Sequence, residues 1–448
     1  MSEEIAIKLT KPVPRYTSYP TAPHFHTGVD QNQYLTWLGE LPENAELSLY
    51  LHLPFCDRLC WFCGCHTKQT NRYSPITAYI ESLAAEIATI GAAAGNRPVT
   101  ALHWGGGSPS LLSVEDIART SEMLRAAFHF SPDLTFSVEL DPNDMSDDKY
   151  AAWAAAGLSR ASIGVQDFDP KVQEAINRIQ TFEQTRHVAE SVRAVGVTSL
   201  NIDMLYGLPH QTLDGAVATA RQVASLRPDR IALFGYAHVP WMKKHQNMID
   251  EAALPNSLER YRQSQAAAAE LVAQGYDRIG FDHFALPHDS LAIANRTGKL
   301  HRNFQGYTVD NHAALIGLGA SAIGRLPQGY IQNVVSTHDY MRRALDGRGA
   351  VEKGVALTDD DRVRGHAIER LLCDFALDFA ELREKFGVLA EPVIADAIKA
   401  AEDDPHGIAR LLHGRLEITA EGKPFARSLA AGLDAYLQVG PARYSKAV

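Results

Sequence analysis

The chain has 448 residues, of which 46% are hydrophobic, 21% charged and 8% aromatic, so it is long enough for a full catalytic domain and a smaller second domain. This composition is that of a globular protein and excludes long disordered or low-complexity segments. The net charge of -10 argues against a general nucleic-acid binder, which carries a basic surface, but it leaves room for a local basic pocket.

The N-terminus is acidic and has no apolar core of signal-peptide length. No uninterrupted apolar run reaches the roughly 18 residues that a membrane span needs. We therefore expect a cytoplasmic protein without a membrane span, in which cysteines stay reduced and can bind metals. Residues 1–45 read as an N-terminal extension over the active site, with a turn-rich stretch in which Tyr16 and Tyr19 are candidate anchors.

From residue 46 onward, short apolar segments alternate with longer segments of helical periodicity. Six short segments are rich in leucine, β-branched and aromatic residues, as strands are. They are residues 47–53, 99–104, 134–140, 160–165, 199–205 and 230–237. The intervening segments predict helices, and several of these end at a glycine or before a proline. They are residues 77–93, 113–127, 146–156, 182–195 and 213–226.

Six strand–helix units in series imply a parallel sheet, because parallel neighbours need crossover connections. Such a chain can form an open doubly wound sheet or an incomplete (β/α)8 barrel. The cysteines follow the first strand, a triple glycine follows the second, and Glu139, Gln166, Asp203 and Tyr236 lie at or near the ends of the other four. Barrel enzymes keep their chemistry at this rim. We therefore predict an α/β fold, a partial (β/α)6 TIM-like barrel.

The remaining chain divides into two parts. Residues 46–345 are expected to form the catalytic domain, which includes an extension of the barrel with a helix at 258–274 and a polar loop at 301–308. From about residue 359 the pattern becomes helical, with a short apolar–polar alternation at 409–419. Residues 346–448 are therefore expected to form a mostly helical C-terminal domain.

Four of the five cysteines, Cys56, Cys60, Cys63 and Cys65, fall within ten residues, and the first three have the spacing C-x3-C-x2-C. Three neighbouring thiolates can ligate three irons of a [4Fe–4S] cluster and leave the fourth iron open to a non-cysteine ligand. The rival is a structural zinc site, with Cys65 or His66 as the fourth ligand. Zinc sites favour two separated C-x2-C pairs or added histidines, so the spacing favours the cluster.

The heptapeptide YLHLPFC at residues 50–56, together with this spacing, resembles the radical S-adenosylmethionine superfamily. The added Gly64-Cys65 pair is similar to the oxygen-independent coproporphyrinogen III oxidases, also called coproporphyrinogen dehydrogenases. The resemblance runs from about residue 12 to the C-terminus. Its other stretches are residues 14–22, 105–109, 201–209, 280–284 and 301–308.

The resemblance implies that Cys56, Cys60 and Cys63 carry the cluster, whereas Cys65 is typical of the family without being a ligand. It also implies two S-adenosylmethionine molecules in adjacent sites, with Phe304 and Gln305 in that region. Ten positions match the family's S-adenosylmethionine contacts, and Tyr50 at the base of the cluster loop is also assigned to the catalytic centre. They are Tyr50, Gly106, Gly107, Ser108, Glu139, Gln166, Arg178, Asp203, Ala237 and Ile323.

The implied reaction is oxidative decarboxylation of two propionate side chains of coproporphyrinogen III to vinyl groups, which gives protoporphyrinogen IX in anaerobic heme biosynthesis. It needs an external reductant and an electron acceptor, both unidentified, and we expect a monomer. The substrate carries four carboxylates, so local cations are needed. We nominate Arg15, Lys68, Arg72 and Arg302.

The alternative function is heme binding or heme delivery on the same scaffold. Chains of that kind look similar around the three cysteines, but they typically lack the extra Gly-Cys pair and the Phe-Gln stretch. Cys65, Phe304 and Gln305 therefore favour the enzyme.

Overall fold

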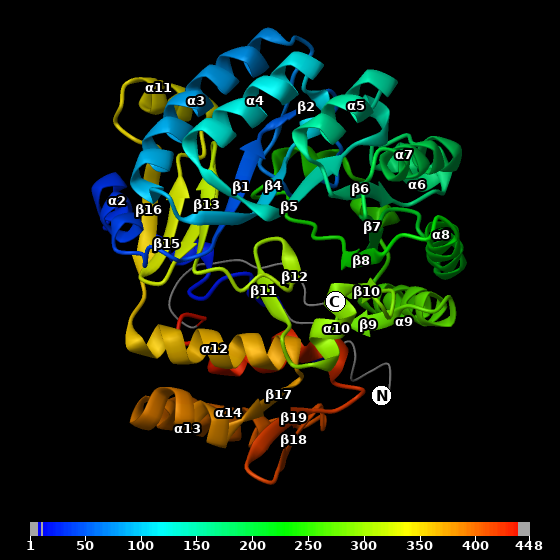
Figure 1. The fold of residues 1–448 in the computed structure, drawn as a ribbon. Helices are drawn as coiled ribbons and strands as arrows, with labels where there is room; N and C mark the ends of the chain where they lie inside the picture. Colours follow the sequence, from blue (N-terminus) through cyan, green and yellow to red (C-terminus); the bar gives the residue numbers. More distant parts are fainter. Residues whose placement is uncertain (1–7, 10–11, 438–448) are drawn as a thin grey trace.

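A curved twelve-stranded sheet forms the large part of the molecule (Figure 1). The computed structural model describes residues 8–9 and 12–437. The six predicted strands are neighbours in the sheet, in chain order and all parallel. They are β1 (Leu47–Leu53), β4 (Pro98–Gly106), β5 (His129–Leu140), β6 (Arg160–Gln166), β7 (Ser199–Tyr206) and β8 (Arg230–Gly235).

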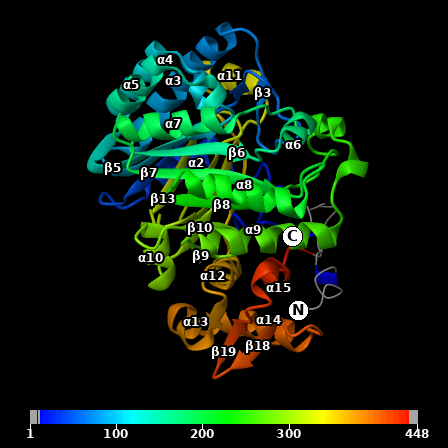
Figure 2. The same ribbon diagram turned by 90° about the vertical axis from the view of Figure 1, so that its right-hand side faces the viewer.

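The helices that connect these strands lie on the outer face of the sheet (Figures 1 and 2). They are α3 (Ser74–Ala94), α4 (Val114–Ala127), α5 (Asp147–Ala156), the short α6 (Pro170–Ala175), α7 (Phe182–Ala194) and α8 (Leu213–Ser225). Ser113 caps α4 by accepting a hydrogen bond from the Asp116 amide, and Gly157 ends α5 with a φ of 97°. The predicted partial (β/α)6 barrel is confirmed.

Strand alternation decides which side chains enter the barrel. In β7, Leu200, Ile202 and Met204 are buried in the apolar core, whereas the alternate residues Asn201 and Asp203 line the barrel interior. Successive residues of a strand point to opposite faces, so an apolar outer set leaves the inner set free to be polar. The barrel therefore combines an apolar outer layer with a polar interior.

Short antiparallel strands extend the sheet at both edges. Beyond β1 lie the parallel β13 (Ala314–Leu318) and then the antiparallel β14 (Ile323–Leu326), β15 (Gly329–Asn333) and β16 (Val351–Ala356). Beyond β8 lie β10 (His283–Ala285) and β9 (Asp277–Ile279). The sheet therefore continues past residue 345, where the sequence places the end of the catalytic domain.

The segment expected to be a polar loop at 301–308 is a tight hairpin, so that expectation was wrong. β11 (His301–Asn303) pairs with β12 (Gly306–Thr308), and Phe304 and Gln305 form its turn. Gly306 has a φ of 111°, and a Cβ there would lie 2.9 Å from the His283 ring, so the turn requires glycine. Helices α9 (Ser257–Ala273), which was predicted, and α10 (Ser290–Arg296) precede it.

The C-terminal part lies across the open side of the barrel in both ribbon views (Figures 1 and 2). It contains α12 (Asp359–Cys373), α13 (Phe379–Phe386), α14 (Glu391–Glu402) and α15 (Ala426–Ala430). The alternation at 409–419 forms the hairpin of β18 (Ala409–Leu412) and β19 (Arg415–Ile418), to which β17 (Ala376–Asp378) adds a third strand.

The segment before α2 (Gln31–Gly39) is anchored on the C-terminal part. The Tyr16 hydroxyl donates to Asp434 at 3.0 Å, and the Tyr19 hydroxyl accepts from the Ala435 amide at 3.0 Å. Tyr19 also packs edge-on against Tyr436. The two tyrosines therefore join the two ends of the described chain.

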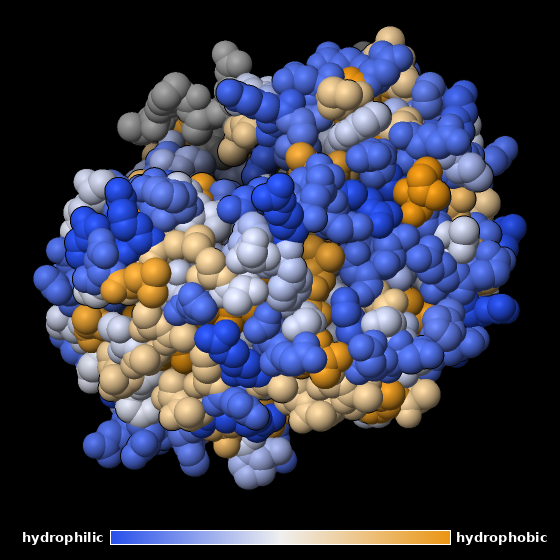
Figure 3. All heavy atoms as spheres, turned by 90° about the horizontal axis from the view of Figure 1, so that it is seen from above, coloured by the Kyte–Doolittle hydropathy of each residue, from blue (hydrophilic) through white to orange (hydrophobic). Residues whose placement is uncertain are grey.

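Helix α3 is the one helix in the described ranges that could span a membrane by length and composition. Half of its apolar stretch is buried, and its buried residues belong to the main hydrophobic core. The face seen from above, on the side of α3 and α4, mixes hydrophilic areas with smaller hydrophobic ones (Figure 3). The apolar composition of α3 thus reflects its packing on the sheet.

Candidate active site

A cavity of about 480 Å³ lies inside the barrel. Inward-facing residues of β4 to β8 form one part of its wall. The other part includes residues of the N-terminal segment, α9, β9, β10, the β11–β12 hairpin and α15. Of the predicted site residues, Glu139, Asp203, Phe304 and Gln305 line this cavity, as does Cys65. Strands β5 and β7 therefore place two carboxylates in the same cavity as the hairpin turn.

The cysteine loop follows β1 and is fixed by hydrogen bonds from distant segments. The Trp61 amide donates to the Ile176 carbonyl at 2.9 Å, and Asn177 donates to the Leu59 carbonyl at 3.0 Å. The sulfur of Cys56 lies 3.0 Å from the Thr67 hydroxyl, and the Cys65 amide donates to the Cys63 sulfur at 3.4 Å. The loop that carries the three thiols is thus held in place at several points.

The segment after β8 contacts the backbone of the cysteine loop through three side chains. Lys243 donates to the Cys65 carbonyl at 2.9 Å, and Nε2 of His245 lies 2.7 Å from the Cys63 carbonyl. Gln246 is fully buried and donates to the Phe62 carbonyl at 2.9 Å. The same side chain donates to the carbonyl of Ala237, one of the predicted contacts. The sequence analysis missed these three residues, because no local pattern links them to a loop about 180 positions earlier.

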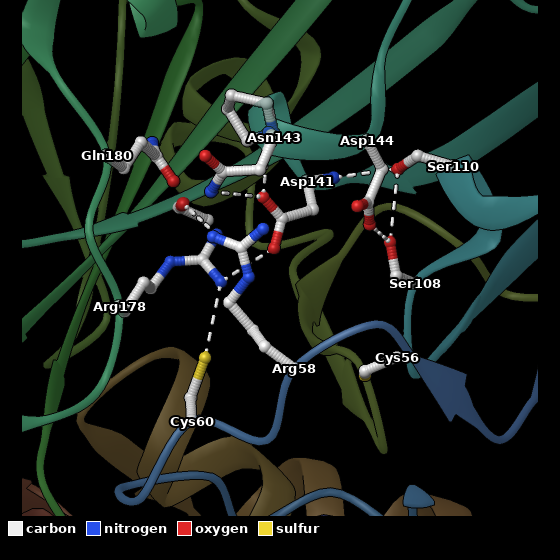
Figure 4. Close-up of polar contacts among 12 residues, drawn as sticks. Cys56, Arg58, Cys60, Ser108, Ser110, Asp141, Asn143, Asp144, Arg178 and Gln180 are labelled. Carbon is white, nitrogen blue, oxygen red and sulfur yellow. Dashed lines mark hydrogen bonds and ion pairs between the residues drawn. The ribbon is translucent and has the colours of Figure 1, made fainter. Parts of the chain in front are cut away.

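Arg178 connects the cysteine loop to the end of β5 (Figure 4). Its Nη1 lies 2.9 Å from an Asp141 oxygen and 3.6 Å from the Cys60 sulfur, and its Nη2 donates to the Gly164 carbonyl at 2.6 Å. Burial raises the pKa of Cys60, and the guanidinium opposes that rise. Arg178 does not line the cavity, and it supplies positive charge beside the Cys60 thiol.

Glu139 is held as an anion at the cavity wall. It lies 3.1 Å from Nε2 of His103 and accepts from the Gly106 amide at 3.1 Å. Burial favours the neutral acid, but these hydrogen bonds outweigh it and leave the pKa of Glu139 below its ordinary value. Tyr50 stacks on His103 with ring centroids 5.7 Å apart, so it supports Glu139 from behind.

The glycines at the end of β4 are required by close packing. A Cβ at Gly105 would lie 2.5 Å from a Glu139 oxygen. Gly106 has a φ of 108°, and a Cβ there would lie 2.4 Å from the His52 ring. The Gly107 and Ser108 amides donate to the carbonyls of Leu53 and Phe55, which ties this turn to the start of the cysteine loop.

The pKa of Asp203 is shifted in the opposite direction from that of Glu139. Asn201 donates to it at 2.7 Å and Ser162 at 3.4 Å, but no basic group forms an ion pair with it in the described ranges. Burial, assisted by the neighbouring Glu139 charge, raises the pKa of Asp203 to about 6. The cavity wall therefore carries one firmly ionised carboxylate and one that protonates just below neutral pH.

The other predicted contacts lie around this wall. Gln166 ends β6 with a φ of 69°, a left-handed conformation that is uncommon for a residue with a side chain. Ile323 and Phe304 belong to one apolar cluster with Phe25 and Tyr330, so the structure brings these two predictions together. Neither Gln166, Ala237 nor Ile323 lines the cavity.

Two of the four nominated cations line the cavity, namely Arg15 and Arg302. Lys68 and Arg72 do not. Lys68 is exposed over the Phe55 ring, and Arg72 is exposed in the following turn. The structure adds Arg260, Arg278 and Arg427, which come from three segments that the sequence did not connect.

A sequence profile of the radical SAM superfamily matches residues 50–223. A protein of Bradyrhizobium diazoefficiens, named oxygen-independent coproporphyrinogen III oxidase, is 46% identical over 437 residues, which cover 97% of both chains. This chain belongs to the family of oxygen-independent coproporphyrinogen III oxidases. A family member from Escherichia coli K12 is 38% identical and covers 95% of this chain and 93% of its own length.

A solved structure of coproporphyrinogen III oxidase (HemN) from Escherichia coli, described as a radical SAM enzyme, has the same fold. The TM-score is 0.90 at 36% identity, over 95% of this chain and 100% of that one. Membership in the coproporphyrinogen III oxidase family implies a [4Fe–4S] cluster and S-adenosylmethionine.

The described residues fit both groups. In the ranges 8–9 and 12–437, no three His, Cys, Asp or Glu side chains gather closely enough to hold a single metal ion. The cysteine loop instead offers one thiolate to each of three irons, with Arg178 beside one of them. Glu139 and Asp203 can accept hydrogen bonds from an ammonium group or ribose hydroxyls, next to a turn that has no room for side chains.

Proposed function

We propose that this chain converts two propionate side chains of coproporphyrinogen III into vinyl groups and thereby produces protoporphyrinogen IX in anaerobic heme biosynthesis. The observation that carries the proposal is one cavity that adjoins the cysteine loop and is lined by seven arginines and three carboxylates. A cationic wall suits a substrate with four carboxylates, and a three-thiol loop suits radical chemistry. The names of the relatives support the same substrate.

In this proposal Cys56, Cys60 and Cys63 hold the cluster, and the ten matched positions surround S-adenosylmethionine. When bound, these groups would supply hydrogen-atom abstraction at a propionate β carbon. The separate electron acceptor would take up the electron that remains when carbon dioxide leaves and the vinyl group forms. Glu139 accepts hydrogen bonds as a fixed anion, and His103 and Tyr50 keep it in position. Arg178 keeps positive charge beside Cys60.

Several finer points belong to the same proposal. Phe304 and Gln305, at the hairpin turn on the cavity wall, border the site of a second S-adenosylmethionine. The N-terminal segment covers the cavity, since Arg15 and Thr17 line it while Tyr16 and Tyr19 anchor the segment. The protein acts as a cytoplasmic monomer, and a separate reductant and electron acceptor supply and remove single electrons.

The test is an anaerobic assay of cluster-loaded protein with coproporphyrinogen III, S-adenosylmethionine, a reductant and an electron acceptor. The proposal expects two vinyl groups per product molecule, and loss of activity in Cys60→Ala at unchanged fold. Tight stoichiometric heme binding without any vinyl product would replace it by the heme-binding function. The Cys373→Ala variant is the matched control. The Cys373 thiol is buried, lies far from the cysteine loop in the sequence, and packs in a different apolar cluster.

A further inference from the structure

Five arginines meet on the side of the cavity that the N-terminal segment and α15 line. Arg15 comes from the N-terminal segment, Arg260 from α9, Arg278 from β9, Arg302 from β11 and Arg427 from α15. The reaction of the cluster does not explain them, because they do not contact the cysteine loop residues that carry it in any described hydrogen bond or ion pair.

Each arginine of this set is held from behind, so that its guanidinium is positioned at the wall. Arg15 donates to the Gly235 carbonyl at 3.3 Å, and Arg260 donates to the Tyr236 carbonyl at 2.9 Å. Arg278 donates to the Phe281 carbonyl at 3.3 Å. The Arg427 guanidinium lies 5.6 Å from the Phe281 ring centroid, and backbone and aromatic contacts of this kind orient a cation.

Arg302 is the central member and has unsatisfied hydrogen-bonding groups. Its guanidinium lies between the Phe281 and Tyr307 rings, 4.8 and 4.7 Å from their centroids, and its side chain is only 5% exposed. Its Nε and Nη1 have no hydrogen-bond partner among the residues that the structure describes. Leaving buried donors unpaired is costly, so the geometry anticipates an acceptor that enters the cavity.

One carboxylate, Asp282, stands among these five cations in the described ranges. It lies 3.8 Å from Nη1 of Arg302, beyond hydrogen-bond distance, and 2.7 Å from Nδ1 of His283, its nearest basic partner. Burial and the neighbouring cations lower the pKa of Arg427 to about 10, and burial also lowers the pKa values of Arg15, Arg260 and Arg278. On this side, five arginines and one carboxylate line the cavity, a composition that suits a ligand with several negative charges.

We propose that this arginine set is the subsite for the two propionate carboxylates that the substrate keeps, and that it decides which propionates react. The inference rests on the proposed function, from which it takes the tetrapyrrole substrate. An arginine pair stabilises a carboxylate but not the neutral carbon dioxide that leaves, so binding the reacting carboxylate there would oppose the reaction. The set therefore suits carboxylates that remain, because a guanidinium group can bind a carboxylate in bidentate geometry.

This assignment gives the C-terminal part a role in specificity. Arg427 belongs to α15, and the adjacent Phe425 stacks on Tyr261 of α9 at 5.7 Å, which fixes α15 against the barrel. Arg15 enters from the opposite end of the chain. Substrate carboxylates would thus join the N-terminal segment, the barrel and the C-terminal part around one ligand.

The test compares Arg302→Gln, Arg427→Gln and Arg410→Gln in cluster-loaded full-length protein. Arg410 is the matched control, since it is an exposed arginine of the C-terminal part that pairs with Glu417 outside the cavity. Coproporphyrin III and its tetramethyl ester, which lacks the charges, serve as binding probes by fluorescence. We expect each cavity variant to weaken coproporphyrin III binding by at least tenfold, to leave ester binding and iron content unchanged, and to give a mixture of vinyl isomers.

Arg302→Lys and Arg427→Lys keep the charge and should recover part of the affinity, which separates a binding role from a folding defect. Unchanged coproporphyrin III affinity in both glutamine variants, or an equal loss in Arg410→Gln, would overturn the subsite. A different result would overturn the proposed function: wild type that binds coproporphyrin III through these arginines but forms no vinyl product. If the variants weaken binding but the wild type and variants give the same single isomer, the specificity role is overturned.

Discussion

Replacing Asp203 by Asn should stabilise the ligand-free protein, although the residue belongs to the proposed site. Burial raises the pKa of Asp203 from 3.8 to about 6, so keeping it ionised at neutral pH opposes folding. Two pKa units correspond to at most ~3 kcal/mol, and because the side chain faces a cavity we expect ~1–3 kcal/mol. Asn keeps the acceptor that Asn201 uses and carries no charge.

The sign of the pH dependence follows from the direction of this shift. Below about pH 3 the carboxyl is mostly protonated in both the folded and the unfolded chain, so its charge no longer separates the stabilities of wild type and variant. The advantage of Asp203→Asn should grow between about pH 4 and 6 and stay constant above. At ~2 cal/mol/K per residue for 448 residues, it amounts to ~1–3 °C in Tm at pH 7.5.

Calorimetry of ligand-free wild type, Asp203→Asn and Asp282→Asn at several pH values measures this. Asp282 is a control of opposite sign in the same cavity. Burial raises the pKa of Asp282, but Arg302 and His283 outweigh burial and leave that pKa below its ordinary value. The ionised carboxylate therefore stabilises the fold, and Asp282→Asn should lose stability at neutral pH. Equal Tm values for wild type and Asp203→Asn at pH 7.5, or a difference that does not change between pH 4 and 7, would refute the reasoning.

Two further predictions concern the cysteine loop and the glycine turn. Gln246→Ala removes a buried amide that donates hydrogen bonds to the Phe62 and Ala237 carbonyls. The iron content per chain should therefore fall, and the unfolding free energy should drop by ~1–3 kcal/mol. The control is Lys244→Ala at an exposed position, which should match wild type in metal analysis. Gly106→Ala places a Cβ against the His52 ring at a positive φ and should lower the unfolding free energy by at least ~1 kcal/mol. Gly39→Ala should not lower it, because no described atom lies within 4 Å of a Cβ at that position. Equal Tm values for the two variants would contradict this prediction.

The barrel could be predicted because its strands and helices carry local patterns. β7 alternates apolar and polar residues, and helices such as α5 end at a glycine, so the six units were found in order. Glu139 and Asp203 could be placed at one rim because each lies near the end of a parallel strand. These inferences need only strand periodicity and the direction of parallel connections.

The rest depends on contacts between distant segments. Strands β9 to β12 have three residues each, which is too short for a period to be recognised. Gln246 and the cysteine loop are brought together only by the tertiary fold. The cations were the least predictable, since Lys68 and Arg72 lie near the motif in sequence but outside the cavity, whereas Arg427 reaches it from the far end of the chain.

The central claim is that this chain removes two of the four carboxylates of its substrate by oxidation. The direct measurement is carbon dioxide release from coproporphyrinogen III labelled with carbon-13 in all four propionate carboxyl groups, under anaerobic conditions with S-adenosylmethionine, reductant and acceptor. The account predicts two labelled carbon dioxide molecules per protoporphyrinogen IX, with two labels retained, and none from Cys60→Ala. No labelled carbon dioxide from cluster-loaded wild type, at full iron content, would contradict it.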